Sequence, residues 1–128
     1  MGFSRFHIYS TISHLVIIMV NKNYVRGANI EYKIKKDLES KGYFCLRSAG
    51  SHSCVDIACI TPTNILLIQV KRSKKALSPN FISSYYDEDI KRLRELTLPD
   101  NCIRYLYFWV DRHGLQKYKI LPDRLELV

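Results

Sequence analysis

The chain lacks the sequence features of several protein classes. Its 128 residues contain no internal repeat and no low-complexity tract, and hydrophobic residues make up 47% of them. This composition argues against a disordered chain. The longest apolar run near the N-terminus, LVIIMV at 15–20, has six residues, which is too short to span a bilayer or to form a signal-peptide core. One domain with its own core is therefore expected.

The domain is expected to begin near Met19. Met19 opens the segment MVNKNYVRGANIE, which is a natural start for the fold. We expect residues 1–18 to be an optional extension, or the product of an upstream start codon, and residues 19–128 to form the single domain. The alternative is that residues 1–18 add a short strand or helix packed on the fold.

Metal-binding cysteine patterns are also missing. The cysteines at 45, 54, 59 and 102 include no C-x-x-C pair, and the histidines at 7, 14, 52 and 113 complete no zinc spacing. We interpret the cysteines as reduced core residues of an intracellular protein. Such a protein would work in the cytoplasm or nucleoid, or in the host cytoplasm if the source is a virus. A zinc site is the alternative.

Acidic residues are few. Twelve Asp and Glu against 20 Lys and Arg give a net charge of +8. This excess favours a polyanionic partner, with nucleic acid before an anionic membrane surface, over a merely soluble basic protein. Two basic segments, KRSKK at 71–75 and KRLR at 91–94, would line a path for phosphates, or else form a solvated face.

Hydrophobic periodicity and turn residues predict a mixed domain. Helices are expected at 27–41 and 87–96, strands at 43–47, 54–60, 65–72, 103–110 and 115–120, and a mobile loop at 73–86. The order of helix, three strands, helix and two strands predicts an α/β (α+β) domain with a central mixed sheet flanked by helices.

One strand, ILLIQVKR at 65–72, begins apolar and ends with an amide and a basic group. Gln69 and Lys71 share one of its faces because side chains alternate along a strand. A hairpin through the four-residue turn TPTN pairs Ile60 with Ile65 and, by counting, Asp56 with Gln69. Directly opposed side chains have Cβ atoms about 4.5–5.5 Å apart. We therefore expect Asp56, Gln69 and Lys71 to lie together.

A second carboxylate comes from the first helix. Ile30, Ile34 and Leu38 form its apolar stripe, and Glu31 lies about 100° from Ile30, at the rim of that stripe. Glu31 either faces solvent, paired with Lys35 four residues on, or joins the cluster. Oxygen ligands that converge in this way suit a hard divalent cation.

These residues lead to a family. The segments RG-x₃-E, KGY-x-C-x-RSAGS, VDI and x-V-K occur in order between Arg26 and Arg72. In this order and spacing they resemble the PD-(D/E)XK nuclease superfamily, and within it the archaeal-type Holliday-junction resolvases. The resemblance implies a restriction-endonuclease-like core and makes residues 19–128 a nuclease domain. It also implies Mg²⁺ as cofactor, with Mn²⁺ able to replace it.

The resemblance also implies roles for single residues. Glu31, Asp56 and Gln69 would hold the metal, Lys71 would position the attacking water or stabilise charge on the phosphate, and Ser51 would contribute to the active site. Gln69 departs from the family pattern, which usually has glutamate there. Arg26 and Arg47 match basic residues near the scissile strand, and the basic run adds Arg72, Lys74 and Lys75 as DNA contacts.

The implied function is metal-dependent, paired cleavage of a four-way DNA junction by a homodimer, with no membrane partner. The strand YLYFWV at 105–110 could supply the dimer surface, or be a buried core strand. One alternative is another nuclease of the superfamily, acting on flaps, ends or duplex DNA. The other is a catalytically weakened DNA-binding protein.

Overall fold

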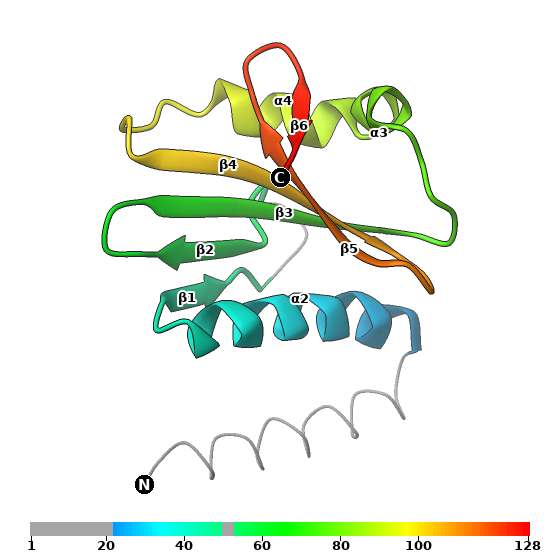
Figure 1. The fold of residues 1–128 in the computed structure, drawn as a ribbon, viewed down its shortest axis with the longest axis horizontal. Coiled ribbons are helices and arrows are strands. Elements are labelled where there is room, and N and C mark those ends of the chain that lie inside the picture. The colour runs from blue at the N-terminus through cyan, green and yellow to red at the C-terminus, as the bar shows by residue number, and fades with distance from the viewer. Residues whose placement is uncertain (1–21, 50–52) are drawn as a thin grey trace, which may run out of the picture.

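The structure is a computed structural model that describes residues 22–49 and 53–128; the predicted extension, residues 1–18, lies outside the described residues. Six strands form one sheet in sequence order, with α2 on one face and α3 and α4 on the other (Figure 1). The elements are α2 (Lys22–Ser40), β1 (Phe44–Arg47), β2 (Ile57–Ile60), β3 (Ile65–Ser73), α3 (Pro79–Tyr85), α4 (Asp87–Glu95), β4 (Cys102–Val110), β5 (Gly114–Ile120) and β6 (Leu125–Leu127). Among the strands of the described residues, only β3 and β4 run parallel, because α3 and α4 connect them across one face. The predicted mixed α+β sheet is confirmed.

The first helix is amphipathic, as its sequence predicts. Ile30, Ile34 and Leu38 are buried against the sheet. The helix ends at Ser40, and Gly42 follows with φ 88°, a conformation that glycine adopts without a steric penalty. The N–H of Gly42 donates to the carbonyl of Glu39 at 2.9 Å. Within the described ranges, no helix is both long and apolar enough to cross a membrane.

The β2–β3 hairpin has the predicted register. Ile60 pairs with Ile65, and Ala58 pairs with Leu67. In the turn, the hydroxyl of Thr61 accepts from the N–H of Asn64 at 2.9 Å. The strand prediction for residues 54–60 was too long by three residues, because β2 begins at Ile57.

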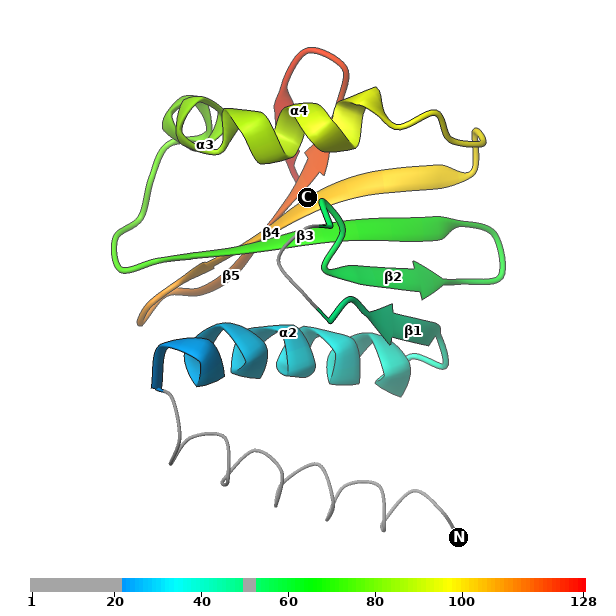
Figure 2. The same cartoon turned by 180° about the vertical axis from the view of Figure 1, so that it is seen from behind.

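The core has two layers, one on each face of the sheet. The layer under α2 includes Ile57 and Ile68, and the layer under α3 and α4 includes Leu106 and Phe108; Figure 2 shows the same arrangement from behind. Leu106, Phe108 and Val110 are completely buried. The strand at 105–110 is therefore a core strand, and its alternative reading as a dimer surface is wrong.

Two short elements were not predicted. The stretch 73–86, expected to be a mobile loop, contains α3, in which only Ile82 is buried. One buried position gives no helical period to detect. The local signals were present nonetheless: Ser78 caps the helix by accepting from the N–H of Phe81 at 3.2 Å, and Pro79 occupies the first turn. The other missed element, β6, has three residues.

The interpretation of all four cysteines as reduced is wrong for one pair. Cys45 and Cys59 form a disulfide between β1 and β2. They are register partners, and both are buried, so their side chains meet on the same face of the sheet. Cys54 and Cys102 are free. The spacing of the cysteines alone could not reveal this pair, because it depends on how β1 aligns with β2.

Candidate active site

The candidate site lies where β2 begins and β3 extends past it. The regular ladder stops at the pair Ile57–Ile68. The N–H of Asp56 donates to the carbonyl of Ile68 at 2.8 Å, and Oδ2 of Asp56 accepts from the N–H of Val70 at 2.7 Å. The carboxylate of Asp56 thus accepts the hydrogen bond that the N–H of Val70 would otherwise donate to a neighbouring strand. It is fixed beside Val70, which lies between Gln69 and Lys71 on β3.

Gln69 is a buried polar residue in the middle of β3, with 5% of its surface exposed. Its Oε1 is buried and has no hydrogen-bond partner within the described part of the chain. Leaving a buried acceptor unsatisfied costs about 1–3 kcal/mol. A hydrogen-bond donor or a cation bound to this amide oxygen would remove the unfavourable free energy. The free oxygen of Gln69 therefore favours a site that binds a ligand.

Lys71 contacts the helix across the sheet face. Its Nζ lies 2.7 Å from Oδ2 of Asp89 on α4 and 5.4 Å from the centre of the Tyr86 ring. The sequence did not identify Asp89 as a site residue. Its only signal in the sequence is the acidic run Asp87–Asp89, whose charge at the N-terminal end of α4 is sufficiently explained by its favourable effect on the helix.

Glu31 reaches the site from α2. Its carboxylate accepts a hydrogen bond from Nε of Arg47 at 3.0 Å, and less than a fifth of either side chain is exposed. Lys35 pairs instead with Glu39 at 3.5 Å, so the alternative in which Glu31 is a surface partner of Lys35 is wrong. The guanidinium of Arg47 also lies over the Tyr32 ring, 4.9 Å from its centre.

The two carboxylates are close enough to affect each other. Burial raises the pKa of Glu31, and the negative charge of Asp56 raises it further, against the lowering effect of Arg47. Burial likewise raises the pKa of Asp56; the N–H of Val70 and the charge of Lys71 partly offset this effect. Both charged forms are therefore under-stabilised in the protein alone, and a cation between them would relieve this.

The donor set fits a hard divalent cation. Carboxylate and amide oxygens are the ligands that such ions prefer, and Gln69 offers a buried oxygen with no other partner. Among the residues that the structure describes, no three His, Cys, Asp or Glu side chains converge on one point. Glu31 and Asp56 alone therefore do not make a complete metal site, and the amide oxygen of Gln69 is the natural addition.

The other predicted site residues differ in where they lie and in what they contact. Ser51 lies outside the described residues, and Arg26 lies on α2. Arg72 binds both carboxylate oxygens of Asp111, each at 2.9 Å, so it is already engaged within the protein. Lys74 and Lys75 are exposed just beyond β3. The site thus brings Glu31, Arg47, Asp56, Gln69 and Lys71 into one region, with Lys74 and Lys75 at the adjoining turn.

A mixed sheet between helices, with carboxylates, an amide and a lysine at the opening of two strands, is the architecture of a restriction-endonuclease-like nuclease. The family model of archaeal Holliday junction resolvases (Hjc) matches residues 22–94, more than half of the chain. The chain belongs to this family, and the resemblance seen in the sequence is confirmed. Its function is that of a structure-specific endonuclease that resolves Holliday junctions, and nucleases of this type are generally metal-dependent.

Among solved structures, the chain is similar to Hjc of Archaeoglobus fulgidus, described as a Holliday junction resolvase from an archaeal hyperthermophile. The two are 20% identical, and the match covers 74% of this chain and 73% of that one with a TM-score of 0.53. At this level of identity the likeness supports the shared fold.

Proposed function

We propose that the protein resolves a four-way DNA junction by paired cuts in two opposed strands, with Mg²⁺ held by Glu31, Asp56 and Gln69, and that Mn²⁺ can replace Mg²⁺. The observation that carries this proposal is the buried, unpartnered Oε1 of Gln69. It lies in β3 beside the residue whose N–H binds Asp56. Two under-stabilised carboxylates and an unsatisfied oxygen in one region are the features of a site that needs a cation.

The residues of the chain would divide the work of phosphodiester hydrolysis. A bound divalent ion supplies Lewis acidity, which polarises the phosphate and makes water a better nucleophile. Lys71 would hold a positive charge beside the phosphate, where negative charge builds in the transition state. Asp89 would fix the ammonium of Lys71 in place, and Ser51 would also contribute to the active site, as the family resemblance implies. Arg47 would orient Glu31 and contact the scissile strand.

DNA binding would use the basic residues around this opening. Lys74 and Lys75 are exposed, and with Arg26, Arg47 and Arg72 they would contact phosphates, which position a protein on DNA without reading its sequence. Arg72 would have to share its charge with Asp111 to do so. We propose that residues 19–128 suffice for this activity, and that the protein acts where junction DNA forms, in the cytoplasm or nucleoid, or in the host cytoplasm if its source is a virus.

A direct test compares a four-way junction with its component duplexes, each incubated with and without Mg²⁺. We expect junction cleavage only with the metal. Asp56→Asn should abolish cleavage while leaving junction binding within about twofold, because phosphate contacts lie on other residues. Cleavage of duplexes or flaps at the same rate as the junction would favour a less specific nuclease. Junction binding without cleavage would favour a weakened DNA-binding protein.

Paired cleavage requires two active sites, so we propose a homodimer. The surface that best supports it is the outer face of the β1–β2 pair, which exposes Phe44 (62%), Leu46 (58%) and Ile60 (50%). Phe44 and Ile60 are register partners, and β1 is an edge of the sheet. Exposed apolar side chains grouped in this way mark interaction surfaces.

The dimer is tested by sedimentation of the wild type and of Leu46→Glu. A charge placed in this patch should yield monomers that still fold. A matched change at an exposed apolar residue elsewhere, Leu127→Glu, should leave the dimer intact. A Leu46→Glu protein that remains dimeric would move the interface away from β1.

A further inference from the structure

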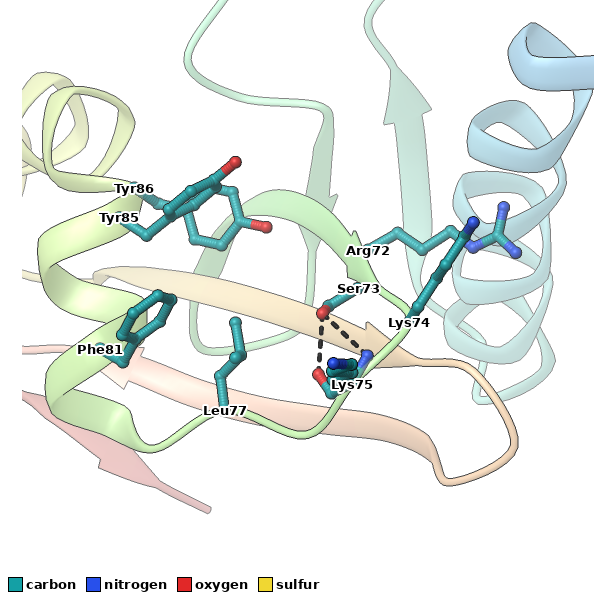
Figure 3. Close-up of a pocket in the computed structure, with 8 residues that line it drawn as sticks. All are labelled: Arg72, Ser73, Lys74, Lys75, Leu77, Phe81, Tyr85 and Tyr86. Carbon is teal, nitrogen blue, oxygen red and sulfur yellow. Dashed lines mark hydrogen bonds between the residues drawn. The ribbon is translucent and has the colours of Figure 1, made fainter.

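A second feature lies near the site: a pocket of about 360 Å³ between the end of β3 and helix α3, whose aromatic side chains have no role in the mechanism above. Lys74 and Lys75 line one side of it, and Leu77, Phe81, Tyr85 and Tyr86 line the other (Figure 3). Its volume falls at the lower end of the range for small-molecule sites, about 300–1,000 Å³. The pocket is therefore large enough for a flat ring system.

The apolar side of the pocket presents aromatic rings to solvent. Phe81 and Tyr85 lie one turn apart on α3, with ring centres 6.0 Å apart and planes within 14° of parallel. They are 52% and 68% exposed, so the fold does not use them as core. Tyr86 meets Tyr85 edge to face at 4.8 Å. Rings displayed in this way offer stacking surfaces to a planar ligand.

The other side of the pocket carries positive charge. Lys74 and Lys75 are exposed, and neither has an ion-pair partner among the residues that the structure describes. The turn that bears them is held by Ser73, whose Oγ donates to the carbonyl of Lys75 at 2.7 Å and accepts from its N–H at 3.1 Å. Figure 3 shows these bonds at the rim of the pocket. Stacking rings opposite unpaired lysines match a nucleotide, which is both flat and anionic.

The pocket adjoins the proposed catalytic lysine through a shared ring. Tyr86 lines the pocket, and its ring centre lies 5.4 Å from Nζ of Lys71. The ring is also packed edge to face on the buried Phe108 at 6.0 Å, so its position is fixed. A base held in the pocket would therefore belong to a nucleotide close to the phosphate that Lys71 contacts.

We propose that this pocket takes an unpaired nucleobase of the strand being cut, with a flanking phosphate on Lys74 and Lys75. The proposal rests on the proposed function and adds to it a source of preference for branched DNA. In duplex DNA each base is paired and stacked on both faces, and taking one out is costly. At a branch point the stack is already interrupted, so a base can leave it at lower cost.

A second copy of the chain is the other candidate occupant. Its approach through this face would bring Lys74 and Lys75 of one protomer toward the same residues of the other, on a chain that already carries +8. Like charges brought together oppose association, whereas phosphates would neutralise them. Charge complementarity therefore favours DNA.

The test measures binding without metal, so it does not depend on cleavage. Affinities of Phe81→Ala and Tyr85→Ala are compared for a four-way junction and for a duplex of the same strands. Loss of one stacked base corresponds to about a 5- to 150-fold loss of affinity. We expect a loss of this size for the junction and less than about twofold for the duplex. Tyr85→Phe keeps the ring and should bind as the wild type does. Because both rings are largely exposed, the variants should keep the wild-type melting temperature.

Abasic substitutions identify the base. Each nucleotide around the branch point is replaced in turn by an abasic one, and the affinity is measured for the wild type and for Tyr85→Ala. At one position the two changes should be non-additive, because the ring and the base lose the same contact. Additive effects at every position would overturn the proposal. So would equal losses on junction and duplex, or a Tyr85→Ala protein that becomes monomeric, since the face would then bind a second copy.

This outcome can be separated from that of the proposed function. If the wild type cuts junctions with Mg²⁺ but the ring variants bind them normally, only the base pocket is wrong. If the ring variants lose junction binding selectively while the wild type cuts nothing, the proposed base pocket is supported and the proposed cleavage is wrong.

Discussion

The ammonium of Lys71 is held by a carboxylate of helix α4: Nζ lies 2.7 Å from Oδ2 of Asp89. Lys71 is on β3 and Asp89 is on α4, 18 residues later in the chain. Both side chains are about a quarter to a third exposed, so the pair is accessible to DNA at the surface of the sheet. The position of the proposed catalytic charge therefore depends on how α4 packs.

Removing this partner should slow cleavage more than it weakens binding. We expect Asp89→Ala to lower the single-turnover rate at saturating Mg²⁺ by about 10- to 100-fold, because small misplacements of a catalytic group have effects of this size. Asp89→Asn, which keeps an acceptor oxygen, should lie between this variant and the wild type. Glu88→Gln is the matched control, since Glu88 is exposed on the same turn. Equal rates for the Glu88 and Asp89 variants would remove Asp89 from the site.

The raised pKa of Asp56 has a consequence for stability. A folded-state pKa above the ordinary value means that the folded protein binds the proton more readily than the unfolded chain. The contribution of Asp56 to stability is then full below the ordinary pKa of aspartate, about 3.9, and is lost as the pH rises through the folded-state pKa. At neutral pH, without metal, the charged carboxylate destabilises the fold.

Asp56→Asn should therefore raise the melting temperature of the metal-free protein at pH 7. The asparagine keeps an oxygen that can accept from Val70. The gain should vanish as the pH falls toward 4, and Mg²⁺ should stabilise the wild type more than the variant. Asp37→Asn, at an exposed carboxylate on α2, should leave the melting temperature almost unchanged, because exposed ion pairs contribute little to stability. An Asp56→Asn protein that melts earlier at pH 7 would contradict this prediction.

The sequence was sufficient for the parts of the fold set by local pattern. The stripe of Ile30, Ile34 and Leu38 predicted the buried face of α2, and the TPTN turn predicted the register of Ile60 with Ile65. This register placed Asp56 beside β3. The regular pairing of β2 with β3 stops at Ile57, next to Asp56, and the carboxylate of Asp56 binds the N–H of Val70. Period and turn chemistry determine these features within a few residues.

The features that the sequence did not reveal depend on tertiary contacts. Asp89 reaches Lys71 only because the β3–β4 crossover lays α4 on that face of the sheet. The partnership of Cys45 and Cys59 depends on the alignment of two strands joined by a loop. Helix α3 buries a single residue, so its amphipathic pattern is too short to detect, and the pocket beside it could not be predicted.

The disulfide predicts a count of reactive thiols. Protein unfolded without a reducing agent should show two thiols, those of Cys54 and Cys102, and four after reduction. Because the bridge closes a loop with a sequence separation of 14, its reduction should lower the free energy of unfolding by about 3 kcal/mol. The double variant Cys45→Ala/Cys59→Ala should match the reduced wild type and be insensitive to reducing agent. Four thiols in the unreduced protein would contradict the bridge.

Junction binding should weaken steeply with salt. Each phosphate neutralised by Lys or Arg releases condensed counterions, so the logarithm of the affinity falls linearly with the logarithm of salt concentration. For six or more contacts the loss between 50 and 200 mM salt is about 10³-fold or greater. The double variant Lys74→Gln/Lys75→Gln should reduce the slope by about 2. Affinity that barely changes over this range would indicate a ligand other than DNA.

Gln69 allows the sharpest test of the metal site. Its buried Oε1 has no partner in the described chain, and an amide oxygen is a hard ligand that brings no negative charge. Gln69→Glu adds that charge, so it should keep the enzyme active and lower the Mg²⁺ concentration needed for half-maximal junction cleavage. Gln69→Ala deletes the oxygen and should raise this concentration by about 10-fold or more, because loss of even a residue that only supports a metal ligand costs about 10- to 100-fold in metal affinity.

Metal binding itself separates a ligand from a structural residue. Calorimetric titration with Mg²⁺ should show tighter binding to Gln69→Glu and weaker binding to Gln69→Ala than to the wild type, whether or not DNA is present. Gln69→Leu serves as the control for packing: it fills the same space without an oxygen, and it removes a buried polar group that costs about 1–3 kcal/mol when unsatisfied. This variant should therefore be more stable than the metal-free wild type and bind Mg²⁺ as poorly as Gln69→Ala. If it binds Mg²⁺ and cuts junctions with an unchanged metal requirement, Gln69 is structural and the metal depends on Glu31 and Asp56 without it.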